Sequence, residues 1–117
     1  MLPQSLRVPS VLILPMLRRG KKIREGSIEL VFERTPEKSA FACIVPVKVD
    51  KRATKRNRMK RLDREAVAAL LPEMTVGVTG IFVVRGKLPD TQLEVVTLVR
   101  SILVKAGLHP YHENRTP

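Results

Sequence analysis

The chain has 117 residues, a length typical of one domain that buries its own core without disulfides or metals. Lys and Arg number 22 against 11 acids, and the net charge of +11 favours a polyanionic partner, either nucleic acid or an anionic membrane surface. Cys43 is the single cysteine, which excludes an internal disulfide and suits a reducing cytoplasm. No apolar stretch reaches the roughly 18 residues of a membrane span, so we expect a cytoplasmic protein that does not cross a membrane.

The N-terminal region divides into an apolar and a basic part. Residues 8–19 favour a short helix, which Pro15 would break or kink if it were long. Gly20 is a plausible helix end. Five of the seven residues in 18–24 are cationic, and they form a candidate secondary basic cluster: Arg18, Arg19, Lys21, Lys22 and Arg24.

Strand patterns follow this basic part. Residues 27–33 alternate partly, with Ile28, Leu30 and Phe32 on one side. Residues 40–49 are rich in β-branched side chains and predict a strand buried on both faces. Pro46 cannot donate to a ladder, so it indicates an edge, a bulge or a split into two short strands.

Residues 54–71 predict the best helix. Asp50 or Thr54 is a candidate N-cap, and Pro72 follows the helix. Cations and Asn57 fall on one side, where Asp63 and Glu65 are expected to relieve repulsion between arginines. The opposite, apolar side comprises Met59, Leu62, Ala66, Ala69 and Leu70.

The last third of the chain predicts one strand and one helix. Residues 80–85 read as a buried strand, and Thr91 with Glu94 forms an S/T-x-x-E capping box. The helix should run to about Lys105, with Gly107 as its C-terminal cap. The whole order indicates an α+β domain, residues 1–108, with a small sheet covered by helices and a flexible tail at 109–117.

Catalytic and metal-binding patterns are missing from the sequence. His109 and His112 are the only histidines and both lie in the predicted tail, where they more often do nothing than share a metal. No Cys-x-x-Cys, nucleophile elbow or phosphate-binding glycine motif occurs. We expect no catalytic residue and no metal or cofactor on the protein itself.

The strongest functional signal is residues 51–61, where seven of eleven residues are Lys or Arg and none is acidic. A merely solvated helix face mixes charge signs, so this pattern favours RNA binding, with affinity that falls steeply with salt. Asn57 can read a base or a 2′-hydroxyl. The candidate RNA-binding residues are Lys48, Lys51, Arg52, Lys55, Arg56, Asn57, Arg58, Lys60, Arg61 and Arg64.

The stretch 48–66, KVDKRATKRNRMKRLDREA, resembles the signature of the bacterial ribonuclease P protein component. That family shows a basic lead-in followed by Arg-Asn-Arg, Lys-Arg and Arg-Glu. The resemblance extends over roughly residues 2–108, including RRGKKIR, GIFVVR and the final AGL. It implies an α-β-β-β-α-β-α sandwich like a domain of a ribosomal protein, with a four-stranded sheet and a left-handed β-α-β crossover.

The resemblance also implies a function. Such a chain is a monomeric protein subunit of a one-to-one ribonucleoprotein endonuclease that removes the 5′ leader of precursor tRNA. Catalysis and its Mg²⁺ belong to the RNA subunit, and the protein binds that RNA and the leader. By the family's pattern, Arg56, Asn57 and Arg61 lie toward the leader. The residues toward the RNA subunit are Lys51, Arg58, Lys60 and Arg64.

Two departures from the family concern the leader cleft and the basic lead-in. Ile13 and Leu17 stand where the family usually has cleft aromatics, so base stacking would be lost there. Phe32 is either the one aromatic left on the cleft or an ordinary core residue. Val47-Lys48 replaces a common Lys-Lys.

Two other functional classes remain open from the residues. A basic, ribosomal-protein-like RNA-binding module would share the salt dependence without stimulating precursor-tRNA cleavage. A stand-alone nuclease or a membrane-surface protein is the third class, and a nuclease would cleave without any RNA partner.

Overall fold

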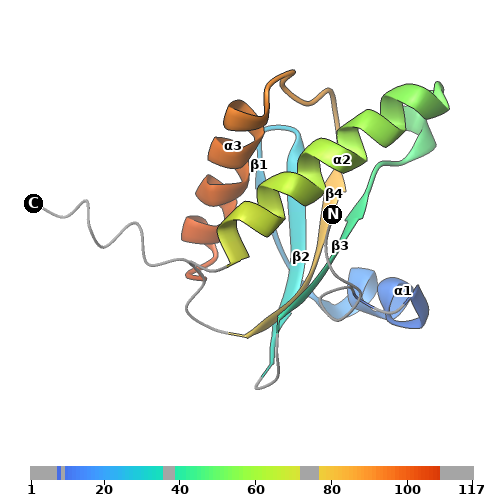
Figure 1. Ribbon diagram of the computed structural model, residues 1–117. Helices are drawn as coiled ribbons and strands as arrows, with labels where there is room; N and C mark the ends of the chain where they lie inside the picture. Colours follow the sequence, from blue (N-terminus) through green and yellow to red (C-terminus); the bar gives the residue numbers. More distant parts are fainter. Residues whose placement is uncertain (1–7, 9, 36–38, 72–76, 109–117) are drawn as a thin grey trace, which may run out of the picture.

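The computed structural model describes residues 8, 10–35, 39–71 and 77–108. It confirms the predicted α+β class, with a four-stranded sheet covered by helices (Figure 1). The predicted tail, with His109 and His112, lies outside the described residues. In chain order the elements are α1 (Ser10–Arg19), β1 (Lys21–Glu25), β2 (Ile28–Arg34), β3 (Ala40–Ile44), the 3-10 helix η2 (Val47–Val49), α2 (Ala53–Leu70), β4 (Val78–Val84) and α3 (Gln92–Lys105).

The strand order in the sheet is β1-β2-β4-β3. β1 and β2 form an antiparallel hairpin through Gly26, whose φ of 57° is a conformation that glycine adopts without a steric cost. β2 pairs antiparallel with β4, and β3 pairs parallel with β4. α2 connects these two parallel strands, so it crosses over one face of the sheet. The left-handedness of that crossover stays a prediction.

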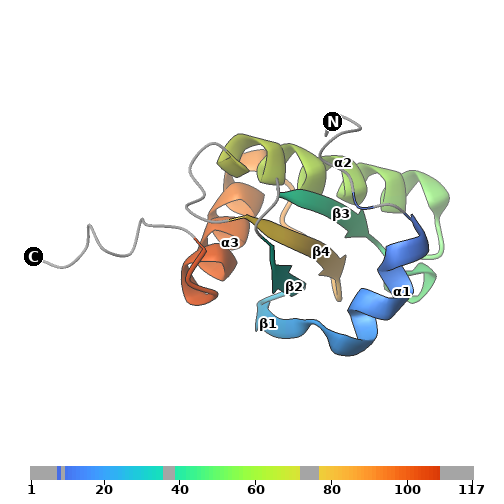
Figure 2. The ribbon, with the colours of Figure 1, turned by 90° about the horizontal axis from the view of Figure 1, so that it is seen from below.

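The two faces of the sheet carry cores of different size. Phe82 and Val84 of β4 face the main core beneath α2 and α3, whereas Ile81 and Val83 face α1. This is the alternation expected of a strand buried on both sides. Figure 2 shows α2 and α3 along one side of the strands and α1 on the other. α2 is thereby held against a rigid sheet by its apolar side.

One strand of the four-stranded sheet was not predicted from the sequence. Pro46 does not split a strand, because β3 ends at Ile44 and Pro46 instead precedes η2. The additional strand is β1, inside the predicted basic cluster. An edge strand with one solvated face needs few apolar residues, and Ile23 is the only one in β1. The charges around Ile23 therefore concealed a strand.

α1 is the short helix predicted from the sequence, and it continues through Pro15. Met16, next to this proline, is 1% exposed and packs against Ile81 and Val83. Such tertiary packing offsets the backbone hydrogen bond that proline cannot donate. The helix ends as predicted at Gly20, whose N–H donates to the carbonyl of Met16 over 2.8 Å.

α2 agrees with the predicted range to within one residue, but three details differ. Neither Asp50 nor Thr54 caps it: Arg52 is the N-cap residue and makes no capping hydrogen bond through its side chain. Ala69 is exposed rather than buried. Asp63, expected among the arginines, is fully buried.

The end of the fold follows the sequence closely. The hydroxyl of Thr91 accepts a hydrogen bond from the Glu94 N–H over 3.3 Å, which confirms the predicted N-cap. Gly107 has a φ of 76°, as expected for a glycine that ends a helix. Within the described residues, no helix is both long and apolar enough to cross a membrane.

Candidate nucleic-acid interface

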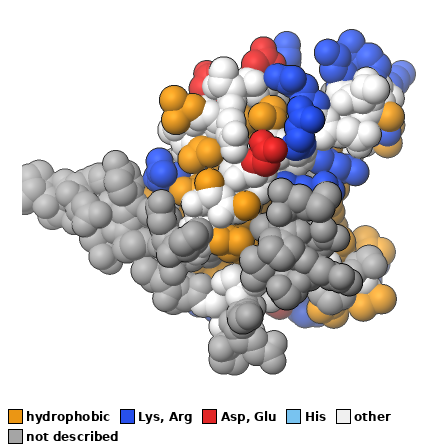
Figure 3. Space-filling view, viewed as in Figure 1, with side chains coloured by type: hydrophobic (Ala, Val, Ile, Leu, Met, Phe, Trp, Pro, Cys, Tyr) orange, Lys and Arg blue, Asp and Glu red, His pale blue; other side chains and the backbone are white. Residues whose placement is uncertain are grey.

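α2 displays its cations because its apolar side is fixed in the main core. Leu62, Ala66 and Leu70 are buried against the sheet and α3. Asn57 and Arg61 are exposed on the outward side, while Lys60 and Arg64 are half-buried. Figure 3 shows blue side chains gathered over the upper right of the molecule, where Figure 1 places the N-terminal half of α2.

The two arginines of the Arg-Asn-Arg tripeptide are tied to neighbouring backbone. Arg56 Nη1 donates to the carbonyl oxygens of Asp50 at 3.0 Å and Lys51 at 2.9 Å. Arg58 Nη2 donates to the carbonyl of Asp90, before α3, at 3.2 Å. A guanidinium has five N–H donors, so both retain donors for a ligand. Because these contacts orient both side chains, an anion would meet positively charged groups that are already placed.

The lead-in to α2 contains cations of two kinds. Arg52 is engaged by Asp50, which accepts from Arg52 Nη2 over 2.9 Å and from the Arg52 backbone N–H over 2.9 Å. The guanidinium and this backbone hydrogen bond hold the pKa of Asp50 down at about 2, so the carboxylate stays charged and offsets Arg52. Lys48, Lys51 and Lys55 are exposed. They supply charge that no ion pair among the described residues neutralises.

The division into leader-facing and RNA-subunit-facing residues stays a prediction, but it does not match two faces of α2. Helical geometry places Arg58 and Lys60, both assigned to the RNA subunit, about 160° apart around the axis, computed at about 100° per residue. Arg58 lies on the flank that contacts the segment before α3. Asn57 and Arg61, assigned to the leader, share the outward side.

The secondary basic cluster lies apart from α2. Lys21, Lys22 and Arg24 belong to β1, at the opposite edge of the sheet from β3. Arg19, at the end of α1, pairs with Glu33 through a contact of 2.6 Å between Arg19 Nε and Glu33 Oε2. The structure therefore does not join this cluster to α2 in one continuous basic surface.

Phe32 packs in the main core, one of the two places that the sequence left open for it. It is 4% exposed and belongs, with Phe41 and Phe82, to the main core beneath α2 and α3. Strand alternation explains this, because Phe32 points the same way as Ile28 and Leu30. Phe32 is therefore mainly a core residue, although it also lines a surface hollow with Arg19 and Lys21, and its part in leader binding stays a prediction.

The environment of Asp63 could not be read from the sequence. This carboxyl is 0% exposed, and no N–H or O–H donor within the described chain reaches either of its oxygens. The thiol of Cys43 on β3 faces it, and burial raises the pKa of Asp63 to about 7 despite that thiol and the nearby charge of Arg64. Burial and the adjacent Asp63 also raise the pKa of Cys43. Cys43 is therefore an unreactive thiol, and Asp63 is a buried acid rather than a surface counter-charge.

The described residues carry no group of three His, Cys, Asp or Glu side chains that could hold a metal ion. What the arrangement can do chemically is bind anions: a rigid helix presents cations and Asn57, with hydrogen-bond donors already oriented.

Comparison with known proteins identifies the family. The family model for ribonuclease P matches residues 12–106. A ribonuclease P protein component from Microcystis aeruginosa is 35% identical over 90 residues, which cover 76% of this chain and 75% of that protein. One from Rippkaea orientalis is 33% identical over 98 residues, covering 78% and 77%. The chain thus belongs to the ribonuclease P protein family.

Solved structures support the same fold. The RNase P protein of Staphylococcus aureus has a TM-score of 0.74 at 15% identity, covering 89% of this chain and 97% of that one. The RNase P protein of Thermotoga maritima has a TM-score of 0.64 at 21% identity, covering 86% and 93%. The shared architecture therefore persists at low sequence identity.

Proposed function

We propose that this chain is the protein subunit of ribonuclease P, binding the catalytic RNA and the 5′ leader of precursor tRNA and so assisting leader removal. The observation that carries the proposal is α2, whose family-signature cations are displayed from a rigid core. Phosphates on bound RNA would offset the repulsion between those cations and release condensed counterions. The protein would act as a monomer in a one-to-one complex in the cytoplasm, with Mg²⁺ held by the RNA.

Leader binding would rest on polar side chains rather than on aromatic ones. Each phenylalanine lies in the main core, and Ile13 and Leu17 are half-buried against the α1 face of the sheet. Leader affinity would then depend on Arg61 and Asn57, through phosphate and 2′-hydroxyl contacts, more than on aromatic stacking. We expect affinity to depend on the presence of a leader but little on its base sequence.

Precursor-tRNA cleavage by a bacterial ribonuclease P RNA at low Mg²⁺, with and without the full chain, tests the proposal. The protein alone should be inert, and adding it to the RNA should restore cleavage. Stimulation that is independent of leader length would restrict the proposal to binding of the RNA subunit. RNA binding without any stimulation would favour the ribosomal-protein-like module instead.

A matched pair of variants tests the footprint. Lys60→Ala with Arg61→Ala removes two charges from α2, and Lys22→Ala with Arg24→Ala removes two from β1, at the opposite edge of the sheet. The α2 pair should reduce the magnitude of the slope of log affinity against log salt by about 1.4–1.8, since each of the two phosphate contacts contributes about 0.7–0.9. The edge pair should change the slope less, and equal changes would extend the footprint to β1.

A further inference from the structure

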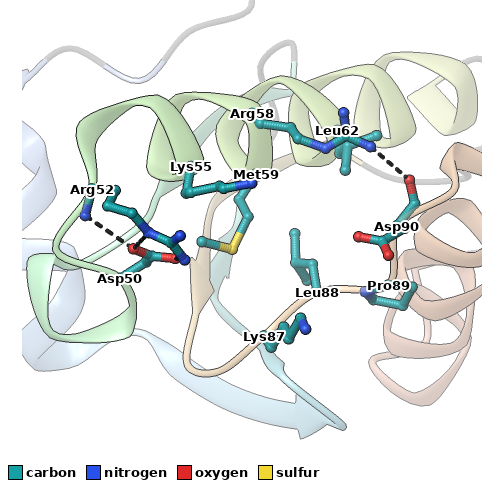
Figure 4. A pocket seen from close by; sticks show the side chains of 10 residues that line it. All are labelled: Asp50, Arg52, Lys55, Arg58, Met59, Leu62, Lys87, Leu88, Pro89 and Asp90. Carbon is teal, nitrogen blue, oxygen red and sulfur yellow. Dashed lines mark hydrogen bonds and ion pairs between the residues drawn. The ribbon is translucent and has the colours of Figure 1, made fainter.

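A hollow of about 280 Å³ lies between the first half of α2 and the segment that links β4 to α3 (Figure 4). Its volume is slightly below the roughly 300–1,000 Å³ of sites for drug-sized ligands. A single nucleotide is therefore a better match in size than a longer chain segment. Arg58 bridges the two walls through its hydrogen bond to the Asp90 carbonyl.

The floor of the hollow is apolar. Leu62 and Leu88 are 8% and 4% exposed, and Met59 and Pro89 are half-buried beside them. Figure 4 shows Met59 reaching from α2 toward Leu88 on the opposite wall. A methionine thioether is polarizable and packs well against aromatic rings. The floor thus offers a base an apolar contact surface in a protein whose described phenylalanines are all buried.

The rim is cationic. Lys55 on α2 and Lys87 on the opposite wall both line the hollow, and neither ammonium has a hydrogen-bond or ion-pair partner among the residues the structure describes. Arg58 adds a third positive charge. Arg52 also lines the hollow, but Asp50 offsets its charge. An anionic group placed over this floor would therefore meet Lys55 and Lys87 on opposite sides.

Asp90 gives the rim one exposed acid that no ion pair within the described part of the chain neutralises. Figure 4 shows its carboxylate turned toward the hollow. A carboxylate repels phosphate, but it accepts hydrogen bonds from exocyclic amino groups of bases. Adenine, cytosine and guanine carry such a group and uracil does not.

We propose that this hollow binds one unpaired nucleotide of RNA, with its base over Met59 and Leu88 and its phosphate between Lys55 and Lys87. Asp90 favours a base with an exocyclic amino group over uracil. The inference rests on the proposed RNA-binding function and deepens it, because the hollow adjoins the cationic helix. Charge complementarity selects this occupant, since an acidic peptide would satisfy the lysines but would leave Asp90 and the flat apolar floor unmatched.

The test observes the methyl signal of Met59 in the full chain labelled with [methyl-¹³C]methionine, assigned through Met59→Leu. The probes are AMP, CMP, GMP, UMP, inorganic phosphate and triglutamate at constant ionic strength. The three amino-bearing nucleotides should shift the Met59 signal at lower concentration than UMP does. The signal of Met16, which α1 buries against β4 on the other face of the sheet, should not shift.

Substitutions at two exposed rim residues then distinguish binding of the phosphate from selection of the base. Lys87→Gln should weaken the binding of every nucleotide by about 2- to 5-fold, which is the effect expected from losing one exposed charge contact. Asp90→Asn should reduce the preference over UMP with little loss of overall affinity. Equal shifts with inorganic phosphate or triglutamate would overturn the inference, as would shifts that Lys87→Gln leaves unchanged.

The same samples distinguish this inference from the proposed function. If nucleotides do not shift the Met59 methyl signal while the protein still binds ribonuclease P RNA and stimulates cleavage, the proposed nucleotide site is wrong and the subunit role stands. If RNA binding and stimulation are both lacking, the proposed function itself is wrong. If Met59 responds to nucleotides and Lys87→Gln weakens both that response and RNA affinity, the site is part of the RNA interface.

Discussion

α2 and α3 pack side by side on the same face of the sheet, but only α3 is built like an ordinary stable helix. α3 begins with a capping threonine and an acid in its first turn, and it ends with Lys105. α2 has no side-chain cap, no acid in its first turn and no base in its last turn. Its cations crowd the N-terminal half, where the helix dipole disfavours positive charge.

The difference between the two helices shows where α2 obtains its stability. A helix with unfavourable end charges depends on burial of its apolar side and on tertiary contacts. Arg56 and Arg58 contribute by tying the start of α2 to segments on either side. Bound phosphate would offset the repulsion among the cations at the start of α2. The charges of α2 therefore suit a complex with an anionic partner better than the free protein.

The largest loss of stability is expected when a charge is placed on the buried side of α2, and the same charge on its exposed side is the control. Ala66 is 0% exposed, and Ala66→Asp buries an unpaired carboxylate, which should cost about 3–5 kcal/mol and leave little folded protein. Ala69→Asp, on the exposed side, should cost less than about 1 kcal/mol. Urea denaturation of both variants measures this. Similar losses would mean that the phase of α2 is wrong.

The next effect concerns Asp63, a buried acid on α2 that has no counterpart on α3. Its pKa in the folded protein is about 7, whereas an unfolded aspartate titrates near 4. Between these values the folded state holds a proton that the unfolded state has lost, so stability should fall as pH rises from 4 to 7. The slope can reach about 1.4 kcal/mol per pH unit at its steepest.

Denaturation at several pH values, for wild type and two variants, checks this. Asp63→Asn should remove the contribution of this group to the slope. Cys43→Ser places a stronger hydrogen-bond donor beside the carboxylate, which should lower the pKa of Asp63 and flatten the slope. An Asp63→Asn variant with the wild-type slope would show that another group titrates.

Capping motifs close in sequence made the ends of α3 predictable, but the burial of Asp63 on α2 and the existence of β1 depend on contacts distant in sequence. The Thr91 box and Gly107 act within a few residues, so the sequence showed both ends of α3. Asp63 is buried because its flank of α2 faces β3, and β1 forms because it pairs with β2. Neither contact leaves a periodic hydrophobic signal in a charged segment.

The candidate site was predictable in charge but not in shape. Charge density along residues 51–61 identified α2 as the basic helix. The hollow also needs Lys87, Leu88 and Asp90, which follow β4 and read in sequence only as a turn. Helix propensity and alternation do not show which segments meet across a fold, and so Phe32 could be placed on a strand but not assigned to a core.

Capping gives a smaller and more local contrast between the helices. Thr91→Ala removes the hydroxyl that accepts from Glu94 and should cost about 1 kcal/mol. Thr54→Ala, in the first turn of α2, should cost less than about 0.5 kcal/mol because the Thr54 side chain caps nothing. Thermal and urea denaturation of both variants measure the two losses. A comparable loss for Thr54→Ala would mean that α2 has a cap that the structure does not show.

The smallest effect is expected at the other end of α3, where Lys105 Nζ lies 2.7 Å from Glu25 Oε1 of β1. The pair lowers the pKa of Glu25, first through the hydrogen bond and then through the charge of Lys105. The Lys105 and Glu25 side chains are 53% and 34% exposed, so water screens the pair, and its coupling in a double-mutant cycle of Glu25→Gln and Lys105→Gln should be about 0.2–1 kcal/mol. High salt should abolish it, because screening is strong at the surface. A coupling that survives 1 M NaCl, where the screening length is about 3 Å, would indicate that the hydrogen bond, rather than charge, joins α3 to the edge of the sheet.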